Sequence, residues 1–491
     1  MPNALPQLPV LRLGKPYFSL ERRTLTDVRT GAPVAEMSQA IPGLVSRDLG
    51  RAAERRRILD AIPVAQLIEI CHRAGELFGT GELPLFPGSD VRFGPDDYLQ
   101  HLTATTGMPL ALGRANLDKI VHVMTGIEGV LDGLTRGLDL SVLDGGWGEQ
   151  HGRKLSYQRL TDDLGAILPN NSPGVHNLWI PAFPLKVPLV LRPGSSEPWS
   201  PYRIVSAFLE AGAPPEAFSL YPGAHSLVPP ILVGTGRSMF FGDASTVAGW
   251  RGTGKVQVHG PGWSKVILGP DVASDNWRQH VPMLADSVAR NGGRSCINCS
   301  GVWAASDGQT ASARAIGEAM ARELLSLEAR ALDHPEAGLA AFPDPEVARA
   351  ISDLVDSHLA TPGAVDLSME ARIAAGKSPS RVAEAGGCTF LLPTVIHAED
   401  PDHPLVACEF IFPFVTVVDC PTEVLFEQIG ETLIGSVVSD DEEFLRRALD
   451  CRHIDRLNLG AMATYRISWD QPHEGNLFDH LYQQRAFQLA S

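Results

Sequence analysis

Between residues 163 and 250 the chain alternates short apolar runs with short amphipathic segments. The apolar runs L-G-A-I-L, V-P-L-V-L and S-M-F-F are each followed by a turn rich in Gly, Pro or Asn, or in Gly and Asp, and then by a segment with helical spacing. Continuous apolar runs are typical of strands buried on both faces of a parallel sheet, and their alternation with helices indicates strand–helix–strand units. We therefore expect a doubly wound α/β sheet in this part of the chain.

Apolar positions in the rest of the chain have mostly helical spacing. A second strand–helix alternation begins near Val256, and a Gly-rich stretch at 145–152 interrupts the pattern before the first sheet. The last ~30 residues are polar and extended, and such tails usually pack onto another lobe or another subunit. We therefore divide the chain into residues 1–255 (a cofactor-type domain with an insertion near 145–165), residues 256–450 (a second α/β domain) and residues 451–491 (a C-terminal segment). The helices expected outside the first sheet are residues 46–78 (in two pieces parted near Pro63), 108–138, 309–332 and 345–359.

Candidate ligand-binding residues follow the predicted strands of the first sheet. Ligands of open parallel sheets bind beyond the carboxyl ends of the strands, where Gly and Asn let the backbone approach them closely and helix N-termini can bind a pyrophosphate. The alternative is that these residues only end the strands. Four such turns in one register favour a nucleotide site. They are Pro169-Asn170-Asn171, Arg192-Pro193-Gly194, Pro222-Gly223 and Gly242-Asp243.

Composition narrows the class of protein. The chain has 41 Lys and Arg against 57 Asp and Glu, a net charge of −16, which argues against nucleic acid as a partner. No apolar run approaches the ~18 residues of a membrane span, and the N-terminus lacks the basic and apolar regions of a secretory signal. Seven thinly spread cysteines do not make a disulfide framework. We therefore expect a soluble, cytoplasmic protein.

Five motifs follow one another along the chain: L-P-N-N, V-L-R-P-G-S-S-E-P-W-S-P, F-F-G-D-A-S-T-V, V-H-G-P-G-W-S-K-V-I-L and N-G-G-R-S-C-I-N. In this order, and over roughly residues 30–465, the chain resembles the aldehyde dehydrogenase superfamily with its thioester-forming acyl-CoA reductase branches. The resemblance implies an α/β fold with a Rossmann-like cofactor domain, a catalytic α/β domain and a small bridging segment used in homo-oligomers. It also implies NAD or NADP as cofactor and an aldehyde or acyl thioester as substrate.

Cys296 is the nucleophile that the resemblance implies. A thiolate that attacks an aldehyde forms a thiohemiacetal, and departure of hydride then leaves a thioester. Small neighbours leave room for a substrate, and the nearby Arg294 could lower the pKa of the thiol. The alternatives are a buried core thiol, or one half of a metal or redox pair with Cys299. The sequence supplies no further pair of zinc ligands at suitable spacing, so we expect no metal.

Two further residues complete the catalytic set that the resemblance implies. The amide of Asn171, with the backbone N–H of Cys296, corresponds to the oxyanion donors, although Asn170 makes the register uncertain by one residue. His259 stands where hydrolytic members carry Glu, with Gln257 two positions earlier. An imidazole can deprotonate water or a thiol, and the alternative is a structural histidine at the turn. The loss of Glu leaves transfer to coenzyme A, or the reverse reaction, open.

The cofactor contacts implied by the resemblance are also altered. Arg192 replaces the lysine that holds the adenosine ribose, and Ser195 replaces the acid of NAD-preferring members, which opens the site to NADP. Asp243 brings a carboxylate where the family has a small hydroxyl residue. Glu409 matches the ribose-binding Glu only after a shift of one residue, and the alternative for its segment is a core strand. The expected cofactor-binding residues are Pro169, Arg192, Ser195, Gly223, Gly242, Asp243, Glu409 and, on the nicotinamide side, Phe412.

Together these residues predict an NAD(P)-dependent aldehyde dehydrogenase that works through a Cys296 thioester. The first alternative is an NADP(H)-dependent, CoA-acylating enzyme or acyl-CoA reductase, which differs only in how the thioester is released. The second alternative is a non-catalytic protein of the same fold that acts as a binding module, because several cofactor positions are altered.

Overall fold

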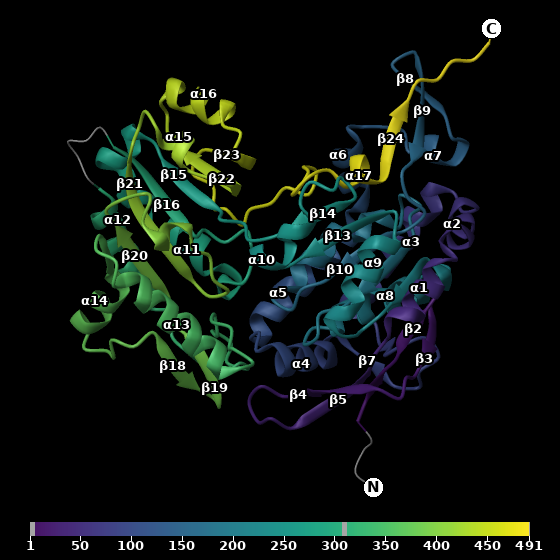
Figure 1. The fold of residues 1–491 in the computed structure, drawn as a ribbon, viewed down its shortest axis with the longest axis horizontal. Coiled ribbons are helices and arrows are strands. Elements are labelled where there is room, and N and C mark those ends of the chain that lie inside the picture. Colours follow the sequence, from purple (N-terminus) through teal and green to yellow (C-terminus); the bar gives the residue numbers. More distant parts are fainter. Residues whose placement is uncertain (1–4, 307–311, 491) are drawn as a thin grey trace. The chain divides into compact units, whose positions relative to one another are not determined.

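The structure, a computed structural model, describes residues 5–306 and 312–490 (Figure 1). The chain forms two compact units. Unit 1 comprises Met1–Thr105, Gly113–Gly260 and Ser468–Ser491, and unit 2 comprises Thr106–Leu112 and Pro261–Ile467.

Unit 1 is built around a seven-stranded sheet in the order β14-β13-β10-β11-β12-β2-β3. The five strands from β14 to β12 are parallel. The strand–helix alternation predicts this pairing for β10 to β13, whereas β14 falls in the segment expected to begin the second α/β domain. Two N-terminal strands extend this sheet in antiparallel fashion, beyond what the apolar pattern indicates. The strands are β2 (Val10–Arg12), β3 (Lys15–Tyr17), β10 (Leu164–Ile167), β11 (Leu189–Arg192), β12 (Phe218–Leu220), β13 (Arg237–Phe241) and β14 (Val256–His259).

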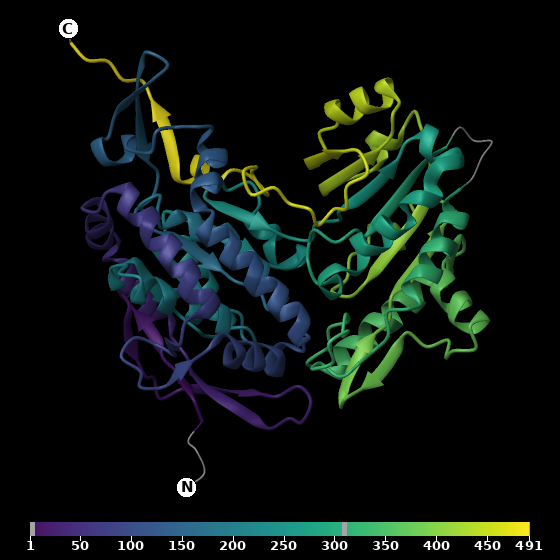
Figure 2. The same cartoon turned by 180° about the vertical axis from the view of Figure 1, so that it is seen from behind.

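Helices cover this sheet. Two of them, α1 and α9, pack together, and an apolar cluster that includes Val45, Ile231, Val190 and Phe240 joins them to the strands. Another pair, α3 and α8, packs together elsewhere in the unit, and Figure 2 shows the blue helices α3 and α5 from behind. The helical stretch over 46–78 is divided at Pro63, as predicted, and a second break after Leu49, which was not predicted, separates α1 from α2. The helices are α1 (Pro42–Leu49), α2 (Ala52–Asp60), α3 (Val64–Thr80), α4 (Pro95–Thr106), α5 (Leu110–Thr125), α6 (Ile127–Thr135), α8 (Trp199–Glu210) and α9 (Val228–Gly234).

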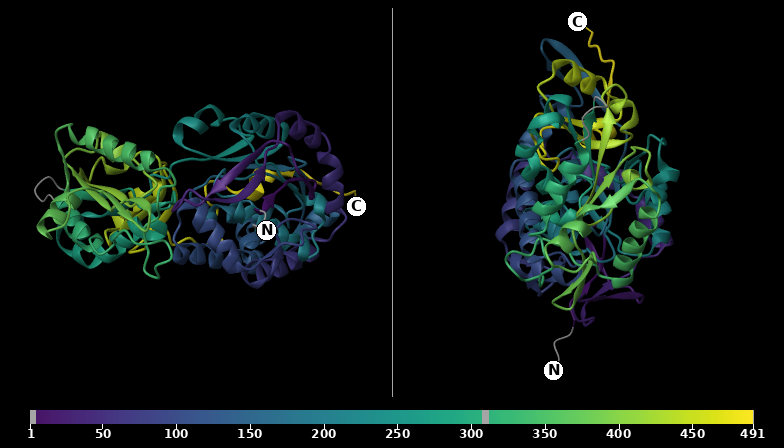
Figure 3. Two further views of the ribbon diagram at one scale, coloured as in Figure 1. Left: turned by 90° about the horizontal axis from the view of Figure 1, so that it is seen from below. Right: turned by 90° about the vertical axis from the view of Figure 1, so that its left-hand side faces the viewer.

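Unit 2 contains the second seven-stranded sheet, in the order β17-β20-β21-β16-β15-β22-β23, parallel except for β17. Alternate residues of its strands enter two apolar clusters. Val266 and Val302 pack with α11 and α12, whereas Ile267 and Trp303 pack with α15 and α16. Helices therefore lie on both faces of this sheet (Figure 3). The strands are β15 (Lys265–Leu268), β16 (Gly301–Ser306), β17 (Ala364–Asp366), β20 (Thr394–Ala398), β21 (Phe414–Pro421), β22 (Thr432–Val438) and β23 (Ile454–Leu459).

The helices of unit 2 test two predictions. The helix over 345–359 is confirmed, because α13 has these bounds and the Asp344 side chain caps its N-terminus. The helix expected over 309–332 is too long at its C-terminal end, and its first residues, up to 311, lie outside the described residues. The chain leaves the helix after Leu324, and the Leu332 carbonyl accepts a hydrogen bond from the Leu110 backbone N–H. The helices are α11 (Val281–Ala289), α12 (Ala313–Leu324), α13 (Pro345–Leu359), α14 (Leu367–Ala374), α15 (Leu425–Gln428) and α16 (Glu442–Asp450).

The boundaries of the units differ from those expected at 255/256 and 450/451. β14 pairs with β13, so unit 1 continues through Gly260. β23 pairs with β22, so the chain stays in unit 2 as far as Ile467. Only the final segment returns to unit 1. There β24 (Tyr482–Arg485) joins β8 (Gly148–Gln150) and β9 (Arg153–Arg159), which form the predicted insertion, in a three-stranded sheet.

The helices of the described residues do not resemble membrane spans. None is both long enough and apolar enough to cross a bilayer.

Candidate functional site

In unit 1 the turns after β10 and β11 lie directly against each other. The Asn170 side-chain oxygen accepts a hydrogen bond from the Ser196 backbone N–H at 2.7 Å, and its amide donates to Ser195 Oγ at 3.5 Å. A Cβ atom on Gly194 would lie 2.4 Å from the Pro169 carbonyl oxygen, so only glycine permits this approach. The side chain of Asn170 is therefore hydrogen-bonded to the neighbouring turn. Asn171, the next residue, is half-buried.

Arg192, at the end of β11, places a buried positive charge at this edge of the sheet. Its side chain is mostly buried, and Nη2 donates to the Gly223 carbonyl oxygen at 2.9 Å. Nε has no hydrogen-bond partner among the described residues. Burial lowers the pKa of Arg192, and the like charge of Arg23, on β4 (Arg22–Thr26), lowers it further. An arginine with a spare donor and a second cation nearby suits a phosphate group.

Glu197, which follows this turn, does not face the same edge. It is 2% exposed, and its carboxylate accepts hydrogen bonds from the Ser200 backbone N–H and from His176 Nε2. No carboxylate from this residue therefore opposes a phosphate at Arg192.

Asp243 occupies the turn after β13, next to Gly242. Its carboxylate caps the short helix α10 (Ala244–Val247), accepting from the Thr246 backbone N–H at 2.9 Å and from the Ser245 and Thr246 hydroxyls. The hydrogen bond from Ser245 and that from the Thr246 N–H lower the pKa of Asp243. An ionised carboxylate therefore stands at this helix N-terminus, where a phosphate would meet repulsion.

His259, at the end of β14, is buried and bound to a residue far along the chain. Its Nδ1 contacts the Glu474 carboxylate, and the Phe241 ring stacks on the imidazole with 4.3 Å between ring centroids. Gln257 Nε2 donates to the Glu474 carbonyl oxygen. The second ring nitrogen of His259, Nε2, has no hydrogen-bond partner in the part of the chain that the structure describes.

The charge state of Glu474 settles which imidazole nitrogen carries the proton. Burial raises the pKa of Glu474, but its interactions with His259 and His473 together outweigh burial, so that the pKa lies below its ordinary value of 4.5. An ionised carboxylate only accepts hydrogen bonds, and Nδ1 must therefore be the donor. In the neutral imidazole this leaves Nε2 as an acceptor. Sequence reasoning missed Glu474, and its only local signal is the H-E-G-N segment of a polar tail.

In unit 2 Cys296 lies on a loop that follows α11. Asn291, Gly292 and Gly293 adopt consecutive left-handed conformations, with φ of 54°, 65° and 71°. Such a run favours glycine and asparagine, which explains the N-G-G of the motif. The Asn298 side chain then holds the loop, accepting from the Ser295 N–H and donating to carbonyls at the end of α11. The loop conformation is therefore strongly specified by local residues.

The backbone of Cys296 is held by the segment that precedes β15. Ser264 Oγ donates to the Cys296 carbonyl oxygen at 2.8 Å, and a Cβ on Gly262 would come within 1.9 Å of that oxygen. The Cys296 side chain is half-buried and packs against a small cluster that includes Ile297 and Leu433. Its sulfur is therefore not enclosed in the main core of unit 2.

Cys299 has a different environment. It is 1% exposed, and its Sγ donates to the Gly301 carbonyl oxygen at 3.1 Å. Burial raises the pKa of Cys299 to about 12. A thiol in this state does not react readily, so a redox partnership of Cys299 with Cys296 is not supported.

Arg294 is also buried. Its guanidinium donates to the Thr106 and Ala341 carbonyl oxygens and lies 6.0 Å from the centre of the Phe342 ring. Burial lowers the pKa of Arg294 to about 10. These hydrogen bonds fasten the Cys296 loop to its neighbours, and an effect of Arg294 on the thiol stays a prediction.

Glu409 and Phe412 differ from their expected surroundings. The Glu409 carboxylate accepts from the backbone N–H groups of Gly262 and Trp263, at 3.1 and 2.5 Å, and so stabilises the turn beside Cys296. Phe412 is 3% exposed and belongs to an apolar cluster of unit 2. A Cβ on Gly293 would meet the Phe412 backbone at 2.3 Å. Phe412 therefore has the surroundings of the core alternative and supports the Cys296 loop.

The described residues contain no group of three or more His, Cys, Asp or Glu side chains that could hold a metal ion.

The two units thus define an α/β protein with a cationic strand edge in one unit and a half-buried cysteine on a specified loop in the other. No family model and no curated protein matches the sequence. Solved structures match the fold over nearly its whole length. The structure of 3,6-anhydro-L-galactose dehydrogenase in complex with NAP has a TM-score of 0.75 at 13% identity and covers 98% of this chain and 99% of that chain.

Two other dehydrogenase structures are similar. The NAD-dependent aldehyde dehydrogenase from Sinorhizobium meliloti has a TM-score of 0.76 at 15% identity, with 98% of this chain and 94% of that chain covered. The NADP-dependent glyceraldehyde-3-phosphate dehydrogenase from Bacillus halodurans C-125, complexed with NADP, has a TM-score of 0.75 at 14% identity, with 98% of each chain covered. The chain therefore has the aldehyde dehydrogenase fold, which confirms the fold that the motifs predict.

Proposed function

We propose that this protein is an NAD(P)-dependent aldehyde dehydrogenase with Cys296 as its nucleophile. The observation that carries the proposal is the half-buried Cys296 on a loop specified by Asn291, Gly292 and Gly293, in a chain with the aldehyde dehydrogenase fold. Similar structures are described as NAD- or NADP-dependent dehydrogenases of aldehydes, which supports the same class of reaction here.

The reaction begins with the Cys296 thiolate. Its sulfur bonds to the aldehyde carbon, and the carbonyl oxygen becomes an oxyanion that the Asn171 amide and the Cys296 backbone N–H stabilise. One such donor contributes ~3 kcal/mol to the transition state. Collapse of the oxyanion expels hydride from the carbon and leaves a thioester on Cys296. A bound nicotinamide dinucleotide supplies the acceptor for this hydride. Water then attacks the thioester, which releases the carboxylic acid and returns the thiol.

His259 is the proposed base for that water. Glu474 holds Nδ1 as the donor, so that Nε2 is free to accept a proton from water, and Phe241 holds the plane of the ring. General bases of this kind contribute about 10²- to 10⁴-fold to a rate. The His259–Glu474 pair supplies a base in place of the family's Glu, so hydrolysis does not require that Glu; the same base could also deprotonate the thiol of coenzyme A.

The cofactor fits one part of the proposed site better than another. Arg192, with its unpartnered Nε, and Arg23 would hold a phosphate, and Ser195 brings no negative charge there. This arrangement favours the 2′-phosphate of NADP. Pro169 and Gly223 would line the same edge. Asp243 opposes a phosphate at α10, so the pyrophosphate would not be held by the helix that follows Gly242.

A second candidate function is that of a non-catalytic binding protein of this fold, because several residues at the expected cofactor positions differ from those of the family. Two observations favour it. The Glu409 carboxylate is hydrogen-bonded to the turn at Gly262, and the Asp243 carboxylate occupies the N-terminus of α10, where a phosphate would otherwise bind.

One assay separates these candidates. Purified protein is screened against aldehydes with NAD and with NADP, with and without coenzyme A, while NAD(P)H formation is followed. We expect turnover without coenzyme A, faster with NADP, and complete loss in Cys296→Ala. The matched control is Cys451→Ala, another half-buried cysteine, which should retain activity. Strict dependence on coenzyme A would favour the acylating enzyme. Turnover that survives in Cys296→Ala would refute the nucleophile, and NADP binding without turnover would favour the binding protein.

We also propose that copies of the chain associate through the three-stranded sheet of β8, β9 and β24. The strand β8 lies at an edge of this sheet, and edge strands pair readily with another chain. Sedimentation of the intact protein should show an oligomer that a Pro substitution at Glu149, on β8, dissociates.

A further inference from the structure

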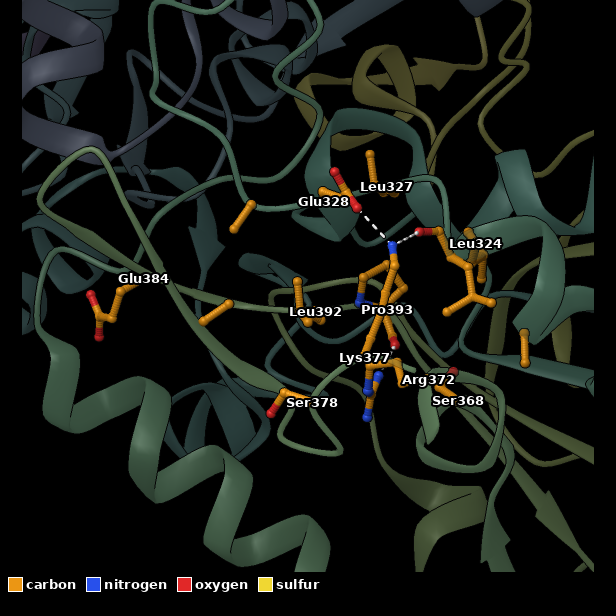
Figure 4. Close-up of a pocket in the computed structure, with 14 residues that line it drawn as sticks. Leu324, Leu327, Glu328, Ser368, Arg372, Lys377, Ser378, Glu384, Leu392 and Pro393 are labelled. Carbon is orange, nitrogen blue, oxygen red and sulfur yellow. Dashed lines mark hydrogen bonds and ion pairs between the residues drawn. The ribbon is translucent and has the colours of Figure 1, made fainter. Parts of the chain in front are cut away.

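Unit 2 contains a cavity of about 300 Å³ away from the Cys296 loop (Figure 4). It lies between the end of α12, the loop that follows, α14, the strand β18 (Val382–Ala385) and the segment after β19 (Cys388–Leu391). No lining residue belongs to the Cys296 loop or its contacts described above. Its volume is at the lower end of the range for small-molecule sites.

Much of the wall is apolar. Leu324, Leu325 and Leu327 come from α12 and its following loop, and Leu392 and Pro393 come from the segment after β19. Figure 4 shows Leu324, Leu327, Leu392 and Pro393 around the same space as Arg372 and Lys377. An apolar body of a few carbons would be removed from water here, which favours its binding.

Arg372, on α14, supplies a buried cation to this cavity. It is 3% exposed, and its Nη atoms donate to the Pro393 and Pro379 carbonyl oxygens at 3.2 and 3.1 Å. Nε has no hydrogen-bond partner within the described ranges. The Asp366 carboxylate lies 4.0 Å away but is bound to Arg381 at 2.8 Å. The Asp366 carboxylate therefore compensates the Arg372 charge only from 4.0 Å, because it is shared with Arg381.

Lys377 and Glu328 form an ion pair of 2.6 Å at the rim of the cavity, with side chains 43% and 54% exposed. Exposed pairs of this kind are weak because water and salt screen them, so the lysine can exchange partners. Glu384 also lines the cavity and accepts a hydrogen bond from Thr389 Oγ1 at 2.7 Å. The two carboxylates at the rim disfavour a ligand with more than one negative charge.

We propose that this cavity binds a small monocarboxylic acid with an apolar body. The carboxylate replaces Glu328 as the partner of Lys377 and faces the Arg372 charge, and the apolar body lies against the leucines. A cationic ligand would be repelled by Arg372, and a phosphate dianion would be repelled by Glu328 and Glu384. The proposal does not require any reaction at Cys296.

Titration calorimetry of the full chain in the Cys296→Ala background tests the proposal, with octanoate as the probe. We expect one site, with octanoate binding at least about tenfold more tightly than 1-octanol, which lacks the charge, or acetate, which lacks the body. Equal binding of octanoate and octanol would overturn the role of the cations. No octanoate binding at millimolar concentration would overturn the site.

Two exposed residues give changes of opposite sign. Lys377→Met should weaken octanoate binding by roughly tenfold, whereas Glu328→Gln should strengthen it by about two- to fivefold, because it frees the lysine and removes a like charge. Leu327→Trp, which fills the cavity, should abolish binding. The matched control, Leu354→Trp on the exposed surface of α13, should not change it. Binding that survives in Leu327→Trp, or shifts in the same direction in both charge variants, would refute the proposal.

Discussion

The described part of unit 1 contains two buried pairs of histidine and glutamate, His176–Glu197 and His259–Glu474. They differ in the hydrogen bonds that the two histidine nitrogens make. In the pair His176–Glu197, Nε2 lies 3.1 Å from the carboxylate and Nδ1 accepts a hydrogen bond from Trp179 Nε1 at 3.0 Å. In the pair His259–Glu474, Nδ1 meets the carboxylate and Nε2 has no partner among the described residues. The two histidine side chains are equally inaccessible, at 1% and 2% exposed.

Burial and a carboxylate partner are common to both histidines, so neither property separates the proposed base from a structural histidine. His176 has both nitrogens satisfied, so its network with Trp179 and Glu197 stabilises the fold and has no acceptor to spare. His259 keeps an unused nitrogen, which costs about 1–3 kcal/mol when buried. That cost is explained if Nε2 takes a proton during the reaction.

The largest expected effect comes from exchanging each histidine for glutamine. His259→Gln should lower turnover by about 10²- to 10⁴-fold and leave the melting temperature nearly unchanged, because the amide can keep the contact with Glu474 but is not a base. His176→Gln should do the opposite, retaining turnover per folded molecule while the free energy of unfolding falls by about 1–3 kcal/mol. Steady-state kinetics and urea unfolding of both variants measure these changes. Equal loss of activity in His259→Gln and His176→Gln would contradict the assignment of His259 as the base and His176 as a structural residue.

A smaller effect is expected from Glu474→Gln. The amide no longer stabilises the positive charge that forms on the imidazole when Nε2 takes a proton, so kcat should fall by roughly tenfold to a hundredfold while KM changes little. The matched control is Glu197→Gln, which should not change kcat. An equal kcat for Glu474→Gln and the wild type would show that His259 acts without its partner or does not act as the base.

The same carboxylate predicts a dependence of stability on pH. The folded pKa of Glu474 lies below its ordinary value of 4.5, so its ionised form stabilises the fold. That stabilisation is fully present above the ordinary value and is lost as the pH falls through the lowered value. The difference in free energy of unfolding between wild type and Glu474→Gln should therefore shrink below about pH 4.5. A difference that grows with acid would contradict the assignment of Glu474 as the ionised partner.

The smallest effect concerns the ring that covers His259. Phe241→Leu removes a stacked contact of 4.3 Å and 12° between the ring planes. Such contacts contribute ~0.5–1.5 kcal/mol, so we expect kcat to fall only a few-fold. Kinetics of this variant beside His259→Gln would show how much of the base's effect depends on a fixed ring plane. A loss as large as that of His259→Gln would mean that Phe241 has a more direct part.

Local patterns predicted much of the architecture correctly. The parallel strands β10 to β13 of unit 1 and the helix capped by Asp344 follow from periodicity and capping, which act over a few residues, whereas β14 was assigned to the wrong domain. The helix expected to reach residue 332 ends at Leu324 instead, and the Leu332 carbonyl accepts a hydrogen bond from Leu110, more than 200 residues earlier in the sequence. Tertiary hydrogen bonds of this kind leave no local pattern.

The candidate site divides in the same way. The turns at Pro169, Arg192 and Gly242, and the N-G-G-R-S-C motif, could be read from the sequence, because strand ends and left-handed conformations require particular residue types nearby. The partners of those residues could not. Glu474 lies 215 positions from His259, and Glu409 lies 147 positions from Gly262.

The sequence by itself determined the two α/β sheets, the ends of the strands and the loop that carries Cys296, since each depends on neighbours within a few residues. Only the tertiary structure decided that Glu474 fixes one nitrogen of His259, that Glu409 holds a turn, and that Arg294 and Cys299 are buried. The physical reason is that charge pairing and burial depend on contacts between residues far apart in the sequence. Hydrophobic periodicity reports only on neighbouring residues and does not indicate those contacts.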